Sequence, residues 1–134
     1  MRVSAGILIV LYLTTLCGAQ GAQAPPKKVV LELLVFDGCP NSPKMAANLT
    51  AALKTLGLPK TFKTVDLRKL PKHDPRLGYG APTILLNGAD LFGLKRTRVT
   101  GSQSCRLYTT GVPSAKAIAA KLKSSPGSTQ QPKD

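Results

Sequence analysis

The sequence is poor in the residue types from which metal and nucleic-acid sites are usually built. Its 134 residues include no Trp, one His, three Phe, three Tyr and three Cys. This count excludes a His-rich metal site and argues against an aromatic platform for stacking nucleic-acid bases. Acidic residues are also scarce: six Asp and Glu face 19 Lys and Arg, for a formal net charge of +13. We therefore expect non-specific contact with anionic surfaces, and no specific nucleic-acid partner.

The first 24 residues have the layout of a secretory signal peptide. Arg2 precedes an apolar run from Ile7 to Leu16, and small residues follow that run. The run is shorter than the about 20 residues that a membrane-spanning helix needs. We expect cleavage after Ala24, Gly21 or Ala19, so that the mature chain is periplasmic or secreted. An uncleaved N-terminal membrane anchor is the alternative.

Loss of the signal peptide would leave two cysteines in the mature chain. Cys17 is removed, while Cys39 and Cys105 remain and meet an oxidising compartment. They can pair with each other, act as separate thiols or bind a soft metal ion. Their sulfur–sulfur distance separates these cases: near 2 Å it is a disulfide, and beyond about 10 Å neither a disulfide nor a shared metal is within reach.

The remaining chain predicts one α/β domain over residues 25–123 and a disordered tail over residues 124–134. Apolar runs bounded by turn residues predict strands, and Asn87-Gly88 predicts a hairpin. The expected strands cover residues 29–36, 61–67, 83–86 and 89–94.

Two helices are expected between and after these strands. The first runs to about Leu56, with Asn41 or Ser42 as its N-terminal cap and Gly57 as its stop. The second is capped by Ser114, with a buried stripe at residues 115, 118, 119 and 122. Residues 68–80 hold at most a short helix.

The order strand–helix–strand, then hairpin and helix, is that of the thioredoxin fold. Cys39 falls where the first strand meets the first helix, and Pro82 begins the third strand. The sequence also resembles a small group of bacterial thioredoxin-like proteins related to glutaredoxins, some of which are labelled as related to alkylmercury lyase. The motifs that carry the resemblance are F-x-G-C-P-N (36–41), G-x-P-T (80–83), N-G-x-D-x-F (87–92), C-R-x-Y (105–108) and G-x-P (111–113).

The resemblance implies a reactive cysteine at Cys39. Unpaired backbone N–H groups at a helix N-terminus stabilise a thiolate there. Pro40 and Asn41 are expected to contact the substrate: Pro40 would restrain the turn, and Asn41 could donate to the sulfur. The carboxylate of Asp37 would oppose ionisation. Ser42 occupies the place of the second cysteine of a Cys-x-x-Cys motif, so a dithiol cycle within the motif is excluded. Cys39 is the thiol expected to react faster near neutral pH.

Four further residues have expected roles, those of Pro82, Ala81 and Cys105 from the resemblance and that of Arg106 from its position beside Cys105. Pro82 is expected to follow a cis peptide bond, which would leave the backbone of Ala81 free to pair with an extended substrate. Cys105 is either a resolving cysteine or a buried core thiol. Arg106 could bind an anion, help to ionise Cys105 or be solvated.

Three functions from different classes remain open at this point. The first is thiol–disulfide exchange with a protein or small-molecule thiol or disulfide, through Cys39 alone or through Cys39 and Cys105. The second is a carrier that holds Cu(I) or Hg(II) between the two thiolates. The third is a binding module without redox activity. No resident cofactor is expected.

Overall fold

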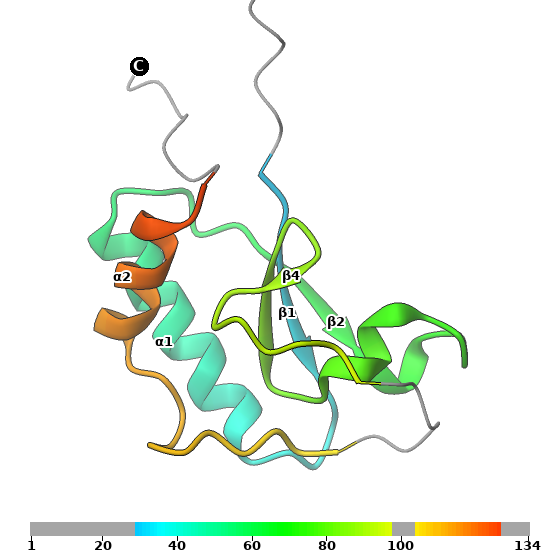
Figure 1. The fold of residues 1–134 in the computed structure, drawn as a ribbon. Coiled ribbons are helices and arrows are strands. Elements are labelled where there is room, and N and C mark those ends of the chain that lie inside the picture. The colour runs from blue at the N-terminus through cyan, green and yellow to red at the C-terminus, as the bar shows by residue number, and fades with distance from the viewer. Residues whose placement is uncertain (1–28, 98–103, 127–134) are drawn as a thin grey trace, which may run out of the picture.

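Four strands form one mixed sheet in the computed structural model, which describes residues 29–97 and 104–126 (Figure 1). Strand β1 (Leu31–Val35) pairs in parallel with β2 (Lys63–Asp66) and antiparallel with β3 (Thr83–Leu86). The short strand β4 (Ala89–Asp90) pairs antiparallel with β3, so the sheet order is β2-β1-β3-β4. The predicted α/β class with a mixed sheet and flanking helices is confirmed.

Two helices pack on one face of this sheet, and their ends correct two predictions. Helix α1 (Asn41–Thr55) connects the parallel strands β1 and β2. Its N-cap is Pro40, so the prediction that Asn41 or Ser42 caps the helix was wrong. The chain is already helical at Pro40, with φ −66° and ψ −19°, which places both residues inside the first turn. Gly57, at φ +66°, ends the helix as predicted.

Helix α2 (Ala115–Ser124) follows the second half of the sheet. The Ser114 hydroxyl accepts a hydrogen bond from the Ala117 N–H at 3.2 Å, which confirms the predicted cap. The helix includes Ser124, so the predicted start of the tail was one residue too early. Residues 127–134 and the predicted signal peptide at 1–24 lie outside the described residues. Within the described ranges, no helix is long and apolar enough to cross a membrane.

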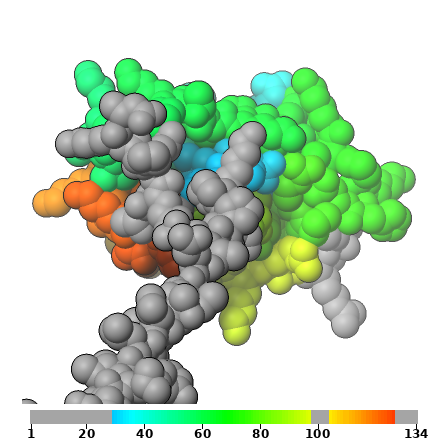
Figure 2. Space-filling model, turned by 90° about the horizontal axis from the view of Figure 1, so that it is seen from above, coloured from blue at the N-terminus to red at the C-terminus, as the bar shows by residue number. Residues whose placement is uncertain are grey.

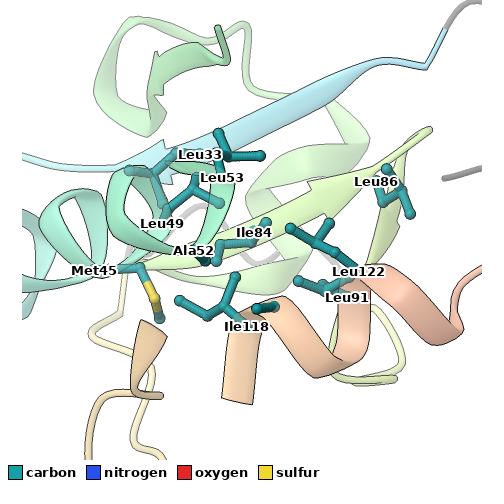
Figure 3. Packing of buried hydrophobic residues seen from close by; sticks show 11 residues of the cluster. Leu33, Met45, Leu49, Ala52, Leu53, Ile84, Leu86, Leu91, Ile118 and Leu122 are labelled. Atoms are coloured by element: carbon teal, nitrogen blue, oxygen red, sulfur yellow. The ribbon is translucent and has the colours of Figure 1, made fainter. Parts of the chain in front are cut away.

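The main core lies between the sheet and the two helices (Figure 3). Alternate residues of β1 and β3 point toward the helices, as the period of two along a strand requires. Each fully buried Leu or Ile side chain contributes about 1.5–3 kcal/mol to folding. The members are Leu33, Met45, Leu49, Ala52, Leu53, Ile84, Leu86, Leu91, Ile118, Ala119 and Leu122.

The opposite face of the sheet is covered by residues 67–80, which form two short 3₁₀ helices, η1 (Leu67–Lys69) and η2 (Pro75–Tyr79). This segment and helix α2 lie on opposite sides of the molecule (Figure 2). A second apolar cluster fills the space beneath it: Leu34, Val65, Leu67, Ala81 and Leu85.

Glu32 is the one charged residue of β1, and η2 supplies its partner. The Arg76 guanidinium contacts the Glu32 carboxylate at 3.1 Å and binds Asp74 at 2.7 Å. Hydrogen bonds from Arg76, only partly offset by burial, lower the pKa of Asp74 to about 2. The segment that contains η1 and η2 therefore neutralises the charge of Glu32, which would otherwise be unpaired in the sheet.

The hairpin between β3 and β4 has the conformation that its sequence predicts. Asn87 and Gly88 have φ values of +52° and +83°, which is the left-handed region required at both positions of a type I′ turn. Strand β4 is shorter than the predicted residues 89–94, because the chain turns again after Asp90, where the Gly93 N–H bonds the Asp90 carbonyl at 3.1 Å.

Candidate redox site

The two cysteines of the domain are in contact although 66 positions separate them in the sequence. The thiol of Cys105 donates to the sulfur of Cys39, with the two sulfur atoms 3.2 Å apart. A disulfide bond is about 2.05 Å long, so both residues are free thiols. Cys105 is exposed and Cys39 is buried, which excludes the alternative that Cys105 is a core thiol.

Cys39 is positioned by the turn between β1 and α1. Its N–H donates to the Phe36 carbonyl at 3.2 Å, and its carbonyl accepts from the Ser42 N–H at 3.1 Å. Gly38 has φ +91°, a value that glycine adopts without strain, and it turns the chain into the helix. Cys39 consequently lies just before the first turn of α1, as predicted, with only 4% of its surface exposed.

The pKa values of the two thiols are shifted in opposite directions. Burial raises the pKa of Cys39, but hydrogen bonds from the Cys105 thiol, the Asn41 N–H and both the hydroxyl and N–H of Ser42 outweigh it, and the pKa is lowered. The hydrogen bond that Cys105 gives to Cys39 raises the pKa of Cys105, and loss of solvent contact and the charge of Cys39 act in the same direction. Cys39 therefore ionises first.

Asp37, which was expected to oppose ionisation of Cys39, is not among the groups that shift the pKa of that thiol. Its carboxylate lies 3.1 Å from the Arg68 guanidinium, and its side chain is 83% exposed. Water and Arg68 therefore screen the charge that would have opposed ionisation of Cys39.

Ser42, which replaces the second cysteine of the familiar motif, has a role of its own. Its Oγ is buried and makes no hydrogen bond of ordinary geometry with the other described residues. Even so, this hydroxyl contributes to the lowered pKa of Cys39. The two observations agree if the hydroxyl lacks a partner while Cys39 is a thiol and donates to the sulfur once it is a thiolate.

Pro82 faces this site, and the Ala81–Pro82 peptide bond is cis, as predicted. The carbonyl oxygen of Ala81 lies 3.7 Å from the Cys39 sulfur. However, the prediction that the backbone of Ala81 is free for a substrate was wrong. Its N–H donates to the Ser104 carbonyl at 3.1 Å, and its carbonyl accepts from the Arg106 N–H at 2.7 Å.

The chain's own residues 104–106 thus form a short parallel bridge beside the cis-proline. Gly80 allows this close approach, because a Cβ there would lie 3.0 Å from the Ser104 carbonyl oxygen, and its φ of +70° also favours glycine. The segment from residue 104 onward passes the N-terminal end of α1 (Figure 1). This path carries Cys105 to Cys39.

Arg106 is neither solvated nor available to an external anion. Its guanidinium binds the Asp90 carboxylate at 2.6 and 3.1 Å and the Thr83 hydroxyl at 3.2 Å. The side chains of Arg106 and Asp90 are 9% and 0% exposed. The charge of Arg106 is therefore already compensated, and the residue fixes segment 104–106 on the sheet.

Tyr108 makes a second attachment of the same segment. Its hydroxyl donates to the Pro82 carbonyl at 2.8 Å, and its ring meets the edge of Phe92 with the centroids 6.1 Å apart. The Arg106 guanidinium lies 4.4 Å from the centre of the same ring. Burial, assisted by the charge of Asp90 and opposed by that of Arg106, raises the pKa of Tyr108 to about 12, so the phenol remains a donor at neutral pH.

Sequence reasoning identified Cys39, Cys105 and Pro82 but missed Asp90 and Tyr108. The signal was present in the motifs N-G-x-D-x-F and C-R-x-Y, which contain both residues. Their acidic, basic and aromatic members pair across the structure, Asp90 with Arg106 and Phe92 with Tyr108. Of the residues expected to bind substrate, Pro40 and Asn41 lie at the start of α1, where the Asn41 N–H bonds the Cys39 sulfur.

Comparisons with protein-family models, with curated proteins and with solved structures gave no match.

Proposed function

We propose that this chain is an exported thioredoxin-like protein that performs thiol–disulfide exchange through Cys39 and Cys105. The observation that carries the proposal is the 3.2 Å contact between the two sulfur atoms. The two cysteines are 66 positions apart, so they meet only because the chain that follows the β3–β4 hairpin returns to the start of α1. Closing the disulfide then needs a further approach of only about 1 Å.

The surroundings of the pair support this chemistry. Cys39 lies at a helix N-terminus with a lowered pKa, and the thiolate is the form that attacks and leaves in disulfide exchange. The Ala81–Pro82 bond is cis, and the Ala81 carbonyl oxygen lies 3.7 Å from the Cys39 sulfur. The sheet order β2-β1-β3-β4, with a parallel crossover first and a hairpin and helix after it, is the arrangement that a thioredoxin-like fold requires.

The same two thiols are the ligands that a soft-metal carrier would use. A linear two-coordinate ion with metal–sulfur bonds of about 2.3 Å, the length known for zinc thiolates, would hold the sulfur atoms about 4.6 Å apart rather than at their present 3.2 Å. Among the described residues, no group of three or more His, Cys, Asp or Glu side chains could surround an ion. A carrier would therefore have only these two thiolates, and their separation is nearer to that of a disulfide than to that of a linear metal site.

The test uses the full chain with Cys17→Ser, so that only Cys39 and Cys105 can react. The protein is equilibrated with mixtures of reduced and oxidised glutathione, quenched with acid and mapped by mass spectrometry. We expect both thiols to disappear together in one two-electron step and to form the Cys39–Cys105 disulfide. Independent mixed disulfides on the two cysteines, with no bond between them, would refute the proposal.

A second arm separates the soft-metal carrier. Reduced protein is alkylated with and without one equivalent of Cu(I). Protection of both thiols by the metal, together with failure to form the disulfide in glutathione, would establish the carrier instead. Neither protection nor disulfide formation would leave a binding module without redox activity.

A further inference from the structure

The acidic thiol and the exposed thiol are two different cysteines in this structure. Cys39 is the more acidic thiol, but it is 4% exposed and lies beneath the Ala81 carbonyl and segment 104–106. Cys105 is the less acidic thiol, but it is exposed. Cys105 is therefore open to a partner sulfur, whereas Cys39 is almost inaccessible while Cys105 and Ala81 lie against it.

That segment is held in place by several contacts. Ser104 and Arg106 bond both backbone groups of Ala81, the Arg106 side chain forms a buried ion pair with Asp90, and Tyr108 bonds the Pro82 carbonyl. The edge beside the cis-proline is therefore occupied by the protein's own chain. Cys105 thus lies on the backbone of Ala81, where an extended substrate was expected to pair.

We propose that partner thiols exchange with this protein at the exposed sulfur of Cys105, with the buried sulfur of Cys39 as the leaving group. The inference rests on the function proposed above. It assigns the roles in the opposite order from the sequence expectation, in which Cys39 makes the attack. The substrate class that fits is a dithiol, oxidised by the disulfide form of the protein.

The reaction balances as follows. A partner thiolate attacks Sγ of Cys105, a partner–Cys105 disulfide forms, and the Cys39–Cys105 bond breaks with its electron pair on Sγ of Cys39. The second thiolate of the partner then attacks the partner sulfur of that mixed disulfide and closes the partner's own disulfide. Cys105 leaves as a thiolate and takes a proton from water. The partner loses two electrons, and the cysteine pair gains them.

The charge left on Cys39 explains why the first step can proceed. The departing thiolate is received by the N–H groups of Asn41 and Ser42 and by the Ser42 hydroxyl. A more acidic thiol is a better leaving group in disulfide exchange. In the reverse direction, Cys105 attacks an external disulfide, and Cys39 resolves the mixed disulfide that results.

The first experiment measures single-cysteine proteins with Cys17→Ser in each. Reduced Cys39→Ser and Cys105→Ser variants are mixed with oxidised glutathione, and the mixed disulfide is followed by mass. In the Cys105→Ser variant the hydrogen bonds from Asn41 and Ser42 still act to lower the pKa of Cys39, and ionisation alone would favour this thiol by about threefold for each unit of lowering. We expect the opposite order in the folded protein, with the variant that retains Cys105 reacting faster. In urea, burial is lost and only ordinary thiol reactivity remains, so the two rates should lie within about twofold of each other.

The second experiment keeps both cysteines. The disulfide form of the Cys17→Ser protein receives a limiting amount of reduced glutathione, is quenched rapidly with acid and is digested for mapping. Glutathione on Cys105 is the expected result. Glutathione on Cys39, or on both residues equally, would overturn the assignment while leaving the proposed function intact. Failure of the protein to form the Cys39–Cys105 disulfide in oxidised glutathione would instead overturn the proposed function.

Discussion

The buried ion pair between Arg106 and Asp90 should stabilise both the fold and the contact between the two cysteines. Arg106→Met removes the charge but keeps a long apolar stem, so the packing of that stem is largely retained. The Asp90 carboxylate, which is 0% exposed, is then left without its cation. Breaking a buried pair in this way costs about 3–5 kcal/mol. The Leu94 N–H still donates to Asp90 at 2.6 Å, which points to the lower end of that range.

Urea unfolding of the reduced protein, followed by circular dichroism, measures this loss. A typical domain has about 5–15 kcal/mol of stability, so the variant should unfold at a clearly lower urea concentration. The double variant Arg106→Met with Asp90→Asn removes the orphaned charge and should recover part of the loss.

Arg68→Met is the matched control. Arg68 pairs with Asp37 on the surface, where the side chains are 47% and 83% exposed, and such pairs contribute about 0–1 kcal/mol. If Arg106→Met is no more destabilising than Arg68→Met, the buried pair does not anchor segment 104–106. If it does anchor the segment, Arg106→Met should also make the Cys39–Cys105 disulfide easier to reduce in glutathione mixtures, and Arg68→Met should not.

Three further predictions concern single side chains. Ser42→Ala should raise the pKa of Cys39 in a thiolate absorbance titration, with little loss of stability at acidic pH, because the hydroxyl lacks a partner while Cys39 is a thiol; an unchanged pKa would contradict this role. The pKa of Asp74 is lowered in the folded state from an ordinary value of 3.8 to about 2. Its ion pair with Arg76 therefore stabilises the protein fully at pH values above 3.8, and this stabilisation is lost as the pH falls toward about 2. Asp74→Asn should therefore reduce stability at neutral pH and flatten the acid limb of the urea-midpoint profile, and parallel profiles would refute the assignment. Gly78→Ala would place a Cβ 2.5 Å from the Thr97 carbonyl oxygen, which should cost about 1–3 kcal/mol in urea unfolding; a change too small to measure would show that the backbone there yields freely.

Much of the framework could be predicted from the sequence because the signals are local. The Asn87-Gly88 turn, the Ser114 cap and the Gly57 stop each depend on the backbone preferences of one or two residues. The placement of Cys39 at a strand–helix junction and of Pro82 at the start of β3 followed from the same kind of pattern. The prediction of the α1 cap failed because the chain is already helical at Pro40, which precedes both of the residues expected to cap the helix.

What only the tertiary structure decided is the set of contacts between distant segments. The sequence could name Cys105 and Arg106 but could not show that one reaches Cys39 and the other Asp90, because such pairings depend on the path of the whole chain. Nor could it show that residues 104–106 occupy the backbone of Ala81. Part of the acidity of Cys39 could be inferred from the helix N-terminus, a local feature, but the hydrogen bond from Cys105 could not. The exposure of each cysteine could not be inferred, because it depends on which distant segment covers the side chain. In this structure the acidic Cys39 is covered and Cys105 is exposed.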